Sequence, residues 1–321
     1  MGSAAGGVRI PVCDHYCGVE KRIQKSLQLQ AEMTEEFGAC VFDVTLDCED
    51  GAPAGGEAEH AAMVAEQVLR AAPGARVATR VHPVDHPCFA ADVEYIVGRA
   101  GRRLTHVMIP KIQSRADVER AVAAVDAAGA GELPLHVLLE SPAAIHHAFS
   151  IAEHPRLQSI SFGLMDFVSA HGGAIPEHAM SLPGQFSHPL VLRAKLEIAS
   201  ACHAFGKVPS HSVVIEFGDV DGVERAARRA AAEFGYTRMW SIHPAQIRPI
   251  LRAMAPQESE IERAASIILL AMQADWAPLS VDGRLHDRAS YRYFWQLLTR
   301  AQQTGRKLPA EIGRLMATAK H

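Results

Sequence analysis

Two acidic side chains stand at the ends of neighbouring apolar runs, Glu140 in LPLHVLLES (133–141) and Asp166 in SISFGLMD (159–166). Each run predicts a buried strand that presents a carboxylate at its C-terminal end, the end that carries the chemistry in a βα barrel. Two carboxylates held together repel each other unless a cation lies between them, and oxygen ligands with open positions suit Mg²⁺ or Mn²⁺. We therefore interpret Glu140 and Asp166 as metal ligands. The alternative is a pair of unrelated surface acids.

Other polar residues follow the remaining predicted strands and are expected at the same end of the fold. They are Asp47, Glu49 and Asp50 in LDCEDG, Arg80 in ATRVHP, Lys111 in MIPK, and His243 and Gln246 in SIHPAQI. Acids, one Arg and one Lys on a common rim suit a metal-chelated anionic substrate, and the Arg80 fork matches a planar carboxylate or enolate. A salt-bridge network is the alternative for the three acids, and a structural ion pair is the alternative for Lys111.

Short β-rich runs alternate with helical patterns along most of the chain. The predicted strands are 8–13, 40–47, 76–81, 106–110, 135–140, 159–164, 210–215 and 238–242. The predicted helices are 19–36, 57–72, 88–100, 114–128, 142–153, 188–205, 220–234 and 244–254. Eight βα units predict an α/β fold, a (β/α)₈ TIM barrel. The runner-up, an open doubly wound sheet, would call for a glycine-rich phosphate turn, and the sequence has neither GxGxxG nor a P-loop.

The barrel domain is predicted to span residues 1–255, and residues 256–321 to form a C-terminal helical extension or lid. PQESEIERAASIILLAMQADW predicts one helix, APLSVDGRLHDRA an irregular stretch, and YRYFWQLLTRAQ an aromatic-rich helix. A segment of this size cannot bury a secure core alone. We expect it to pack on the barrel or on a neighbouring subunit.

Composition narrows the class of protein. A net charge of −4 argues against a nucleic-acid partner, and no run of apolar residues is long enough to span a membrane. The six cysteines are scattered, and the start of the chain lacks the apolar core of a signal peptide. These features predict a cytoplasmic protein with reduced thiols.

Taken together, LDCEDG, TRVHP, MIPK, LLES, SFGLMD and SIHPAQI resemble, in this order and spacing, the citrate lyase beta-subunit family. That family includes the malyl-CoA and citramalyl-CoA lyases of the HpcH/HpaI aldolase superfamily, and the resemblance runs from about residue 8 to about residue 300. It implies a metal-dependent barrel with a C-terminal extension, assembled as a homotrimer or hexamer. It also implies reversible cleavage of a carbon–carbon bond beside a carbonyl or thioester, with Mg²⁺ stabilising an enolate.

The resemblance also implies roles for individual residues. Glu140 and Asp166 become metal ligands, and Arg80 contacts the substrate carboxylate or enolate. Lys21 and Lys25 in VEKRIQKS fall where relatives bind acyl-CoA, and Ile242 and His243 lie on a segment that lines the same site. Asp287 in VDGRLHDRA matches the family's catalytic acid/base, which reaches the site from the C-terminal extension, often that of a neighbouring subunit. A solvated helix face is the alternative for the two lysines, and a helix N-cap is the alternative for Asp287.

The chain departs from the family pattern at several positions. The first strand runs into PVCDHYCG where relatives have a VPG turn, His82 replaces the usual Asn, Ser141 the usual Thr, and Arg288 the usual Pro. The metal ligands are kept, whereas the region that selects the substrate and holds the CoA tail is altered.

The sequence thus predicts a Mg²⁺-dependent carbon–carbon lyase acting on a 3-hydroxyacyl-CoA-type or related hydroxy-acid substrate. Its catalytic residues would be Arg80 and Asp287, with Asp47, Glu49, Asp50 and Lys111 in supporting positions. A CoA-independent 2-keto-acid aldolase and a non-catalytic homologue that keeps metal and acid binding are the alternatives.

Overall fold

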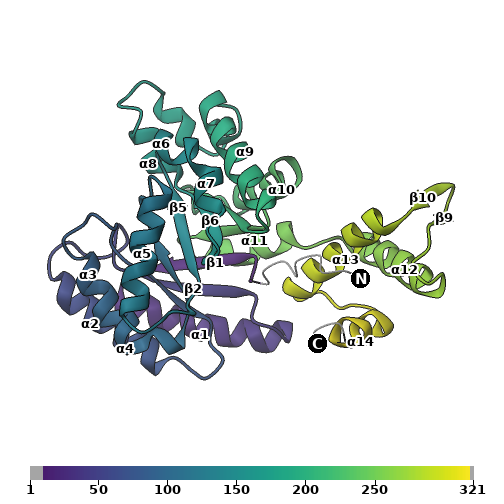
Figure 1. Ribbon diagram of the computed structural model, residues 1–321, viewed down its shortest axis with the longest axis horizontal. Helices are drawn as coiled ribbons and strands as arrows, with labels where there is room; N and C mark the ends of the chain where they lie inside the picture. Colours follow the sequence, from purple (N-terminus) through teal and green to yellow (C-terminus); the bar gives the residue numbers. More distant parts are fainter. Residues whose placement is uncertain (1–9, 319–321) are drawn as a thin grey trace.

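Eight parallel strands close into a barrel in the computed structural model, which describes residues 10–318 (Figure 1). The strands are β1 (Cys13–Cys17), β2 (Phe42–Asp47), β3 (Val77–Arg80), β4 (Leu104–Ile109), β5 (Leu135–Leu139), β6 (Leu157–Phe162), β7 (Val208–His211) and β8 (Arg238–Ser241). Neighbours in the chain are neighbours in the barrel, and β1 pairs with β8 to close it, with Cys13 opposite Met239. The predicted α/β fold, a (β/α)₈ TIM barrel with a C-terminal helical extension, is confirmed.

Helices return the chain between the strands and cover the outside of the barrel. They are α1 (Glu20–Phe37), α2 (Glu57–Arg70), α3 (Phe89–Asp92), a π-helical segment (Val93–Val97), α4 (Gly98–Ala100), a 3₁₀ turn (Gly101–Arg103), α5 (Arg115–Ala127), α6 (Pro142–His146), α7 (Ala148–Ala152), α8 (Leu164–Ser169), 3₁₀ turns Glu177–Met180 and Gly184–Phe186, α9 (Pro189–Ala204), α10 (Val220–Phe234), a 3₁₀ turn (Pro244–Gln246) and α11 (Ile247–Met254). Local sequence explains their limits. For example, Ser114 and Asp117 form a capping box that starts α5, and Gly38 ends α1 with a φ of 68°.

The first strand lies later than the sequence predicted. The apolar run 8–13 predicts a strand, but β1 begins only at Cys13, and residues 8 and 9 lie outside the described residues. Pro11 lacks a backbone N–H, whereas the polar residues Asp14 and His15 sit inside a fully buried strand. The apolar run 8–13 therefore lies mostly before β1 and not within it.

The barrel interior is layered. At its base lie the polar residues of the early strand positions, including Asp14, Asp43 and Arg238. Above them is an apolar floor, formed by Tyr16, Met108, Leu138, Val213 and Trp240. Because side chains alternate along a strand, Glu140 faces the same way as Leu138 and His136, but one step nearer the open mouth. The C-terminal ends of the strands therefore form a charged mouth above an apolar floor.

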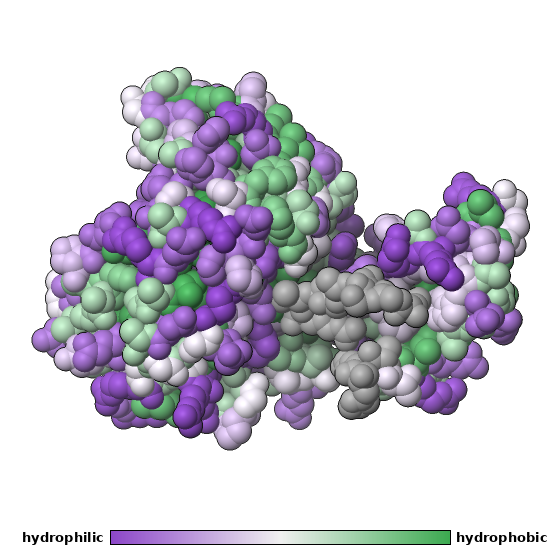
Figure 2. All heavy atoms as spheres, viewed as in Figure 1, coloured by the Kyte–Doolittle hydropathy of each residue, from purple (hydrophilic) through white to green (hydrophobic). Residues whose placement is uncertain are grey.

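The C-terminal extension stands beside the barrel as a separate lobe (Figures 1 and 2). It consists of α12 (Glu258–Gln273), β9 (Leu279–Val281), β10 (Arg284–His286), α13 (Arg288–Gln303) and α14 (Ala310–Thr318). The stretch expected to be irregular contains the antiparallel β9–β10 hairpin, and the helices share a small core that includes Ile268, Tyr291 and Leu298. The predicted boundary at 255 falls between α11 and α12, and Gly305 packs closely on Phe37 at the end of α1.

Candidate active site at the barrel mouth

Arg80, the last residue of β3, is held in place by two acids of the β2 segment. Its Nε and Nη2 donate to Asp47 Oδ1 and Oδ2 over 2.7 and 2.6 Å, and Nη1 lies 2.9 Å from Glu49 Oε2. Burial opposes ionisation of Asp47, but the Arg80 charge outweighs it and lowers the pKa of that carboxyl. A guanidinium has five N–H groups, so this arrangement leaves two for another acceptor. Asp47 and Glu49 therefore form a salt-bridge network, the alternative considered for these acids in the sequence. This network orients Arg80.

Lys111, just after β4, joins this network and also contacts Glu140. Its Nζ lies 2.5 Å from Glu49 Oε1 and 3.8 Å from Asp50 Oδ1. Its φ of 54° is unusual for a residue with a side chain, and its backbone N–H donates to Glu140 Oε1 over 2.7 Å. This turn therefore fixes the direction of the Glu140 carboxylate.

Glu140 carries a strongly perturbed carboxyl group. It is only 4% exposed, and burial raises its pKa to about 8, with further contributions from the charges of Asp166 and Glu49. Gly163 lies so close that a Cβ there would be 2.4 Å from Glu140 Oε2. Burial beside a second carboxylate makes ionisation of Glu140 unfavourable unless a cation is present. A divalent cation would stabilise the ionised form.

Asp166 lies in the first turn of α8, which begins directly after β6 and Gly163. Its negative charge raises the pKa of both Glu140 and Lys111, so the Asp166 carboxylate lies near these two groups at the barrel mouth. Among the described residues, the donor set here is oxygen only, which fits Mg²⁺ or Mn²⁺.

The residues expected to contact an acyl-CoA lie on two neighbouring segments of the rim. Lys21 and Lys25 project from the exposed face of the first turns of α1, opposite the buried Ile23. Ile242 and His243 follow β8 and are exposed; the His243 ring stacks on Phe217 with a 5.2 Å separation of centroids. Because β1 pairs with β8, these two segments leave the barrel from neighbouring strands.

Asp287 caps a helix. Its Oδ1 accepts hydrogen bonds from the backbone N–H of Ala289 and Ser290, over 2.9 and 3.3 Å, at the start of α13. Figure 1 shows the adjoining β9–β10 hairpin at the outer end of the extension, away from the barrel. Within one chain, Asp287 therefore does not join the site at the mouth, and the catalytic role assigned to it requires a neighbouring subunit.

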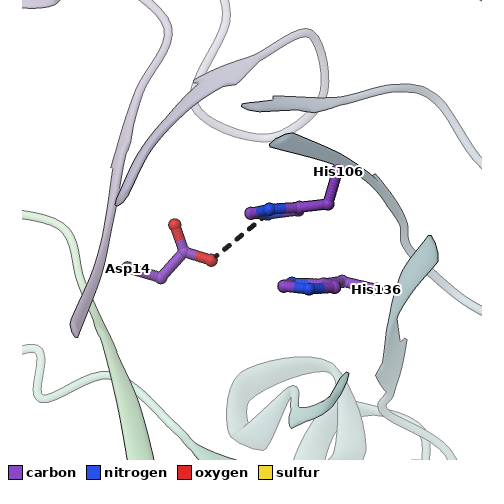
Figure 3. Close-up of side chains that lie close together, drawn as sticks. All are labelled: Asp14, His106 and His136. Atoms are coloured by element: carbon purple, nitrogen blue, oxygen red, sulfur yellow. Dashed lines mark ion pairs between the residues drawn. The ribbon is translucent and has the colours of Figure 1, made fainter. Parts of the chain in front are cut away.

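A second cluster of potential metal ligands was not found from the sequence. Asp14, His106 and His136, from β1, β4 and β5, bring one ligand atom each within 4.8 Å of one another at the base of the barrel (Figure 3). The signal for this cluster in the sequence is the histidine inside each of two otherwise mostly apolar strands, His106 in LTHVMI and His136 in LHVLL. However, the two imidazoles are stacked with centroids 3.5 Å apart, so their in-plane lone pairs cannot converge on one ion.

Arg238 also argues against a cation in this cluster. Its Nη2 lies 2.8 Å from Asp14 Oδ2 and 2.7 Å from Asp43 Oδ2, so the Asp14 charge is already compensated. A divalent ion would face a buried guanidinium at close range. We therefore interpret the Asp14 cluster as a buried polar network, and Glu140 and Asp166 stay the predicted metal ligands.

Comparisons with known proteins identify the family. Residues 27–244 match the model of the HpcH/HpaI aldolase/citrate lyase family, and the chain belongs to that family. An L-malyl-CoA/beta-methylmalyl-CoA lyase of Cereibacter sphaeroides is 32% identical over 279 residues, which cover 80% of this chain and 87% of that protein. The family resemblance and the lyase class expected from the sequence are thus confirmed.

Solved structures agree with this assignment. A citrate lyase from Burkholderia xenovorans LB400 has a TM-score of 0.83 and 48% identity, covering 97% of this chain and 98% of that one. A Mycobacterium tuberculosis protein, CitE, was solved with magnesium, acetoacetate and coenzyme A. It has a TM-score of 0.68 over 91% of this chain and 98% of its own, and at 22% identity it shows the shared fold.

Among residues 10–318, no helix is both long and apolar enough to cross a membrane.

Proposed function

We propose that this protein is a Mg²⁺-dependent carbon–carbon lyase that cleaves, or forms, a 3-hydroxyacyl-CoA-type substrate at the barrel mouth. The observation that carries the proposal is the buried Glu140 carboxyl, held by the Lys111 N–H and raised in pKa by burial and by Asp166. The name of the Cereibacter sphaeroides relative supports a substrate such as L-malyl-CoA. Mn²⁺ would also satisfy this donor set.

Glu140 and Asp166 would hold the metal. When bound, Mg²⁺ would supply Lewis-acid polarisation of the substrate carbonyl and offset the negative charge that develops there. The residues present fit such an ion because burial, and after it the negative charges of Asp166 and Glu49, raise the pKa of Glu140, and a bound cation would offset both effects.

Arg80 would bind the anionic end of the substrate. Two of its N–H groups remain after its contacts with Asp47 and Glu49, and the low exposure of its side chain, 6%, strengthens any hydrogen bond made there. The same groups would donate to the enolate oxygen as the Cα–Cβ bond breaks. Such preorganised electrostatic stabilisation is commonly the largest catalytic contribution.

The supporting residues would hold this arrangement in place. Asp47 and Glu49 orient Arg80, while Lys111 bridges Glu49 and Glu140. The apolar floor beneath them limits how deep a substrate can enter, so the acyl part would lie at the mouth and its thiol carrier would leave along the rim. Lys21, Lys25, Ile242 and His243 border that exit and would contact the carrier.

Asp287 would complete the site from a neighbouring copy, in a homotrimer or hexamer. The β9–β10 hairpin that precedes Asp287 lies at the outer end of the extension, which would bring this residue to a neighbouring barrel, and its protonated carboxyl group would give a proton to the enolate carbon. The proposal is tested by incubating the protein with Mg²⁺ and a panel of 3-hydroxyacyl-CoAs and 4-hydroxy-2-keto acids. Release of acyl-CoA from the first group supports it, whereas turnover of only the second group favours a CoA-independent aldolase.

A further inference from the structure

His82 lies two residues beyond Arg80 on the extended segment that continues β3. Residues two apart on an extended segment face the same side, so His82 is directed to the same side of the barrel wall as Arg80. The residue is largely buried, with 9% of its surface exposed. The sequence marked this position only as a departure from the family, where Asn is usual.

Asp92, at the end of α3, fixes the orientation and the tautomer of this imidazole. Its Oδ2 accepts the backbone N–H of His82 over 2.9 Å and lies 2.7 Å from His82 Nδ1. An ionised carboxylate can only accept, so Nδ1 carries the proton and Nε2 has a free lone pair. Among the described residues, none forms a hydrogen bond with Nε2. The ring also stacks on the exposed ring of His86, with centroids 4.3 Å apart and planes 11° apart, whereas its orientation is fixed by the two hydrogen bonds to Asp92.

We propose that His82 is the base that takes the proton from the substrate's β-hydroxyl group. This inference rests on the proposed function, in which none of Arg80, Glu140, Asp166 and Asp287 removes the hydroxyl proton. His82 Nε2 accepts the hydroxyl proton, the O–H electron pair becomes the second bond of a new C=O, and the Cα–Cβ pair passes to the enolate. The enolate carbon then takes a proton from a different acid, for which Asp287 of a neighbouring copy is the candidate. The reverse sequence describes condensation.

Two other residues of the mouth are less suited to this step. Burial opposes the charge on Lys111, but its hydrogen bond to Glu49 and the surrounding acids outweigh burial and raise its pKa, so the amine keeps its proton. His243 accepts the backbone N–H of Ala245 at its Nδ1, over 3.2 Å, and has no carboxylate partner among its hydrogen bonds. The His82–Asp92 pair alone has the oriented base that general base catalysis requires.

The experiment separates the two proton transfers. Cleavage of L-malyl-CoA requires proton removal from the hydroxyl, whereas exchange of the methyl protons of acetyl-CoA in D₂O requires only the group that acts at Cα. We expect His82→Asn to lower kcat for cleavage by about 10²–10⁴-fold, the usual contribution of a general base. Exchange and Mg²⁺ affinity should stay within about threefold of wild type.

Matched variants exclude a structural effect. His86→Asn changes the stacked neighbour, which is exposed and has no carboxylate partner, and should leave cleavage within about threefold. Added imidazole should restore part of the activity lost in His82→Ala, which a purely structural role would not allow. Asp92→Asn provides a second route to the same answer if the His82 variants fold poorly, because it removes the group that fixes the tautomer.

The possible outcomes are distinct. Cleavage by His82→Asn within tenfold of wild type, or a parallel loss of exchange and cleavage, would overturn the assignment of His82. A wild-type protein that cleaves no substrate and exchanges no protons would remove the proposed function and, with it, this role. A wild type that cleaves normally alongside an equally active His82→Asn would remove only the role of His82.

Discussion

Arg80 binds Asp47 through two parallel hydrogen bonds of 2.7 and 2.6 Å, deep in the barrel mouth. This pairing fixes the plane of the guanidinium and directs its two remaining N–H groups without leaving an uncompensated charge. The sequence predicted that Arg80 binds a substrate anion, and in the structure Arg80 also forms a buried ion pair with Asp47. Its function in binding depends on Asp47 as much as on its own charge.

Replacing Arg80 by Lys tests that geometry. Lys keeps the charge but cannot form the two-pronged contact with Asp47 and bind a substrate anion at once. We expect kcat/KM to fall on the order of 10- to 100-fold, the value of a charge-assisted hydrogen bond. Steady-state kinetics, together with a melting curve to check folding, provide the measurement. Activity close to wild type would mean that Arg80 has a structural role only.

Asp287→Asn separates a catalytic acid from a helix cap. Asn caps a helix as well as Asp does, so the start of α13 should remain intact. If Asp287 transfers a proton, kcat should fall by about 10²–10⁴-fold while metal binding is retained. A change of tenfold or less would leave Asp287 as the N-cap seen here and move the Cα proton transfer elsewhere.

The position of the extension predicts an oligomer. The lobe touches its own barrel near Phe37, but its outer end lies away from the barrel and it exposes large apolar side chains such as Leu285 and Tyr293, which are 73% and 63% exposed. Apolar surface of this kind is usually covered in an assembly. Sedimentation velocity should show a trimer or hexamer at micromolar concentration. A stable monomer with full lyase activity would rule out a contribution from the neighbouring copy.

The raised pKa of Glu140 predicts how magnesium binding depends on pH. Its ordinary value is 4.5, and burial with the neighbouring Asp166 charge raises it to about 8 in the metal-free fold. The folded protein then binds this proton more tightly than the unfolded chain, so the stabilisation is complete below about pH 4.5 and is lost as pH rises through 8. Magnesium needs the ionised carboxylate.

Magnesium should therefore raise the melting temperature more at pH 9 than at pH 6. The comparison with and without Mg²⁺ at each pH cancels the other titrating groups. Glu140→Gln is the control, since it keeps the shape of the side chain but cannot ionise, and its melting temperature should not respond to Mg²⁺ at either pH. An equal Mg²⁺ effect at both pH values in the wild type would show that Glu140 does not bind the ion.

The sequence predicted those features that depend on local pattern. Apolar runs located six of the eight strands to within two residues at each end, whereas the run 210–215 overlaps β7 (Val208–His211) only at Ser210 and His211. The acids after β5 and β6 could be predicted because strand ends share one rim. The first strand was misplaced because Asp14 and His15 interrupt its apolar pattern.

Features that depend on contacts between residues far apart in the chain could not be predicted from local sequence patterns. Asp14, His106 and His136 come from three strands that only barrel closure brings together. His82 and Asp92 meet because the chain turns back after β3, which their ten-residue spacing does not reveal. The strands of the β9–β10 hairpin have only three residues each, too few for an alternating pattern to distinguish them from an irregular stretch.

The most direct test of the account is L-malyl-CoA cleavage by the wild type and by Glu140→Gln, each with Mg²⁺ and with EDTA. We expect the wild type to release acetyl-CoA and glyoxylate only when Mg²⁺ is present. We expect the folded Glu140→Gln variant to bind Mg²⁺ weakly and to be inactive under both conditions. Turnover by Glu140→Gln at the wild-type rate with unchanged Mg²⁺ affinity, or full wild-type activity in EDTA, would contradict the central claim that Glu140 and Asp166 form the metal site of this lyase.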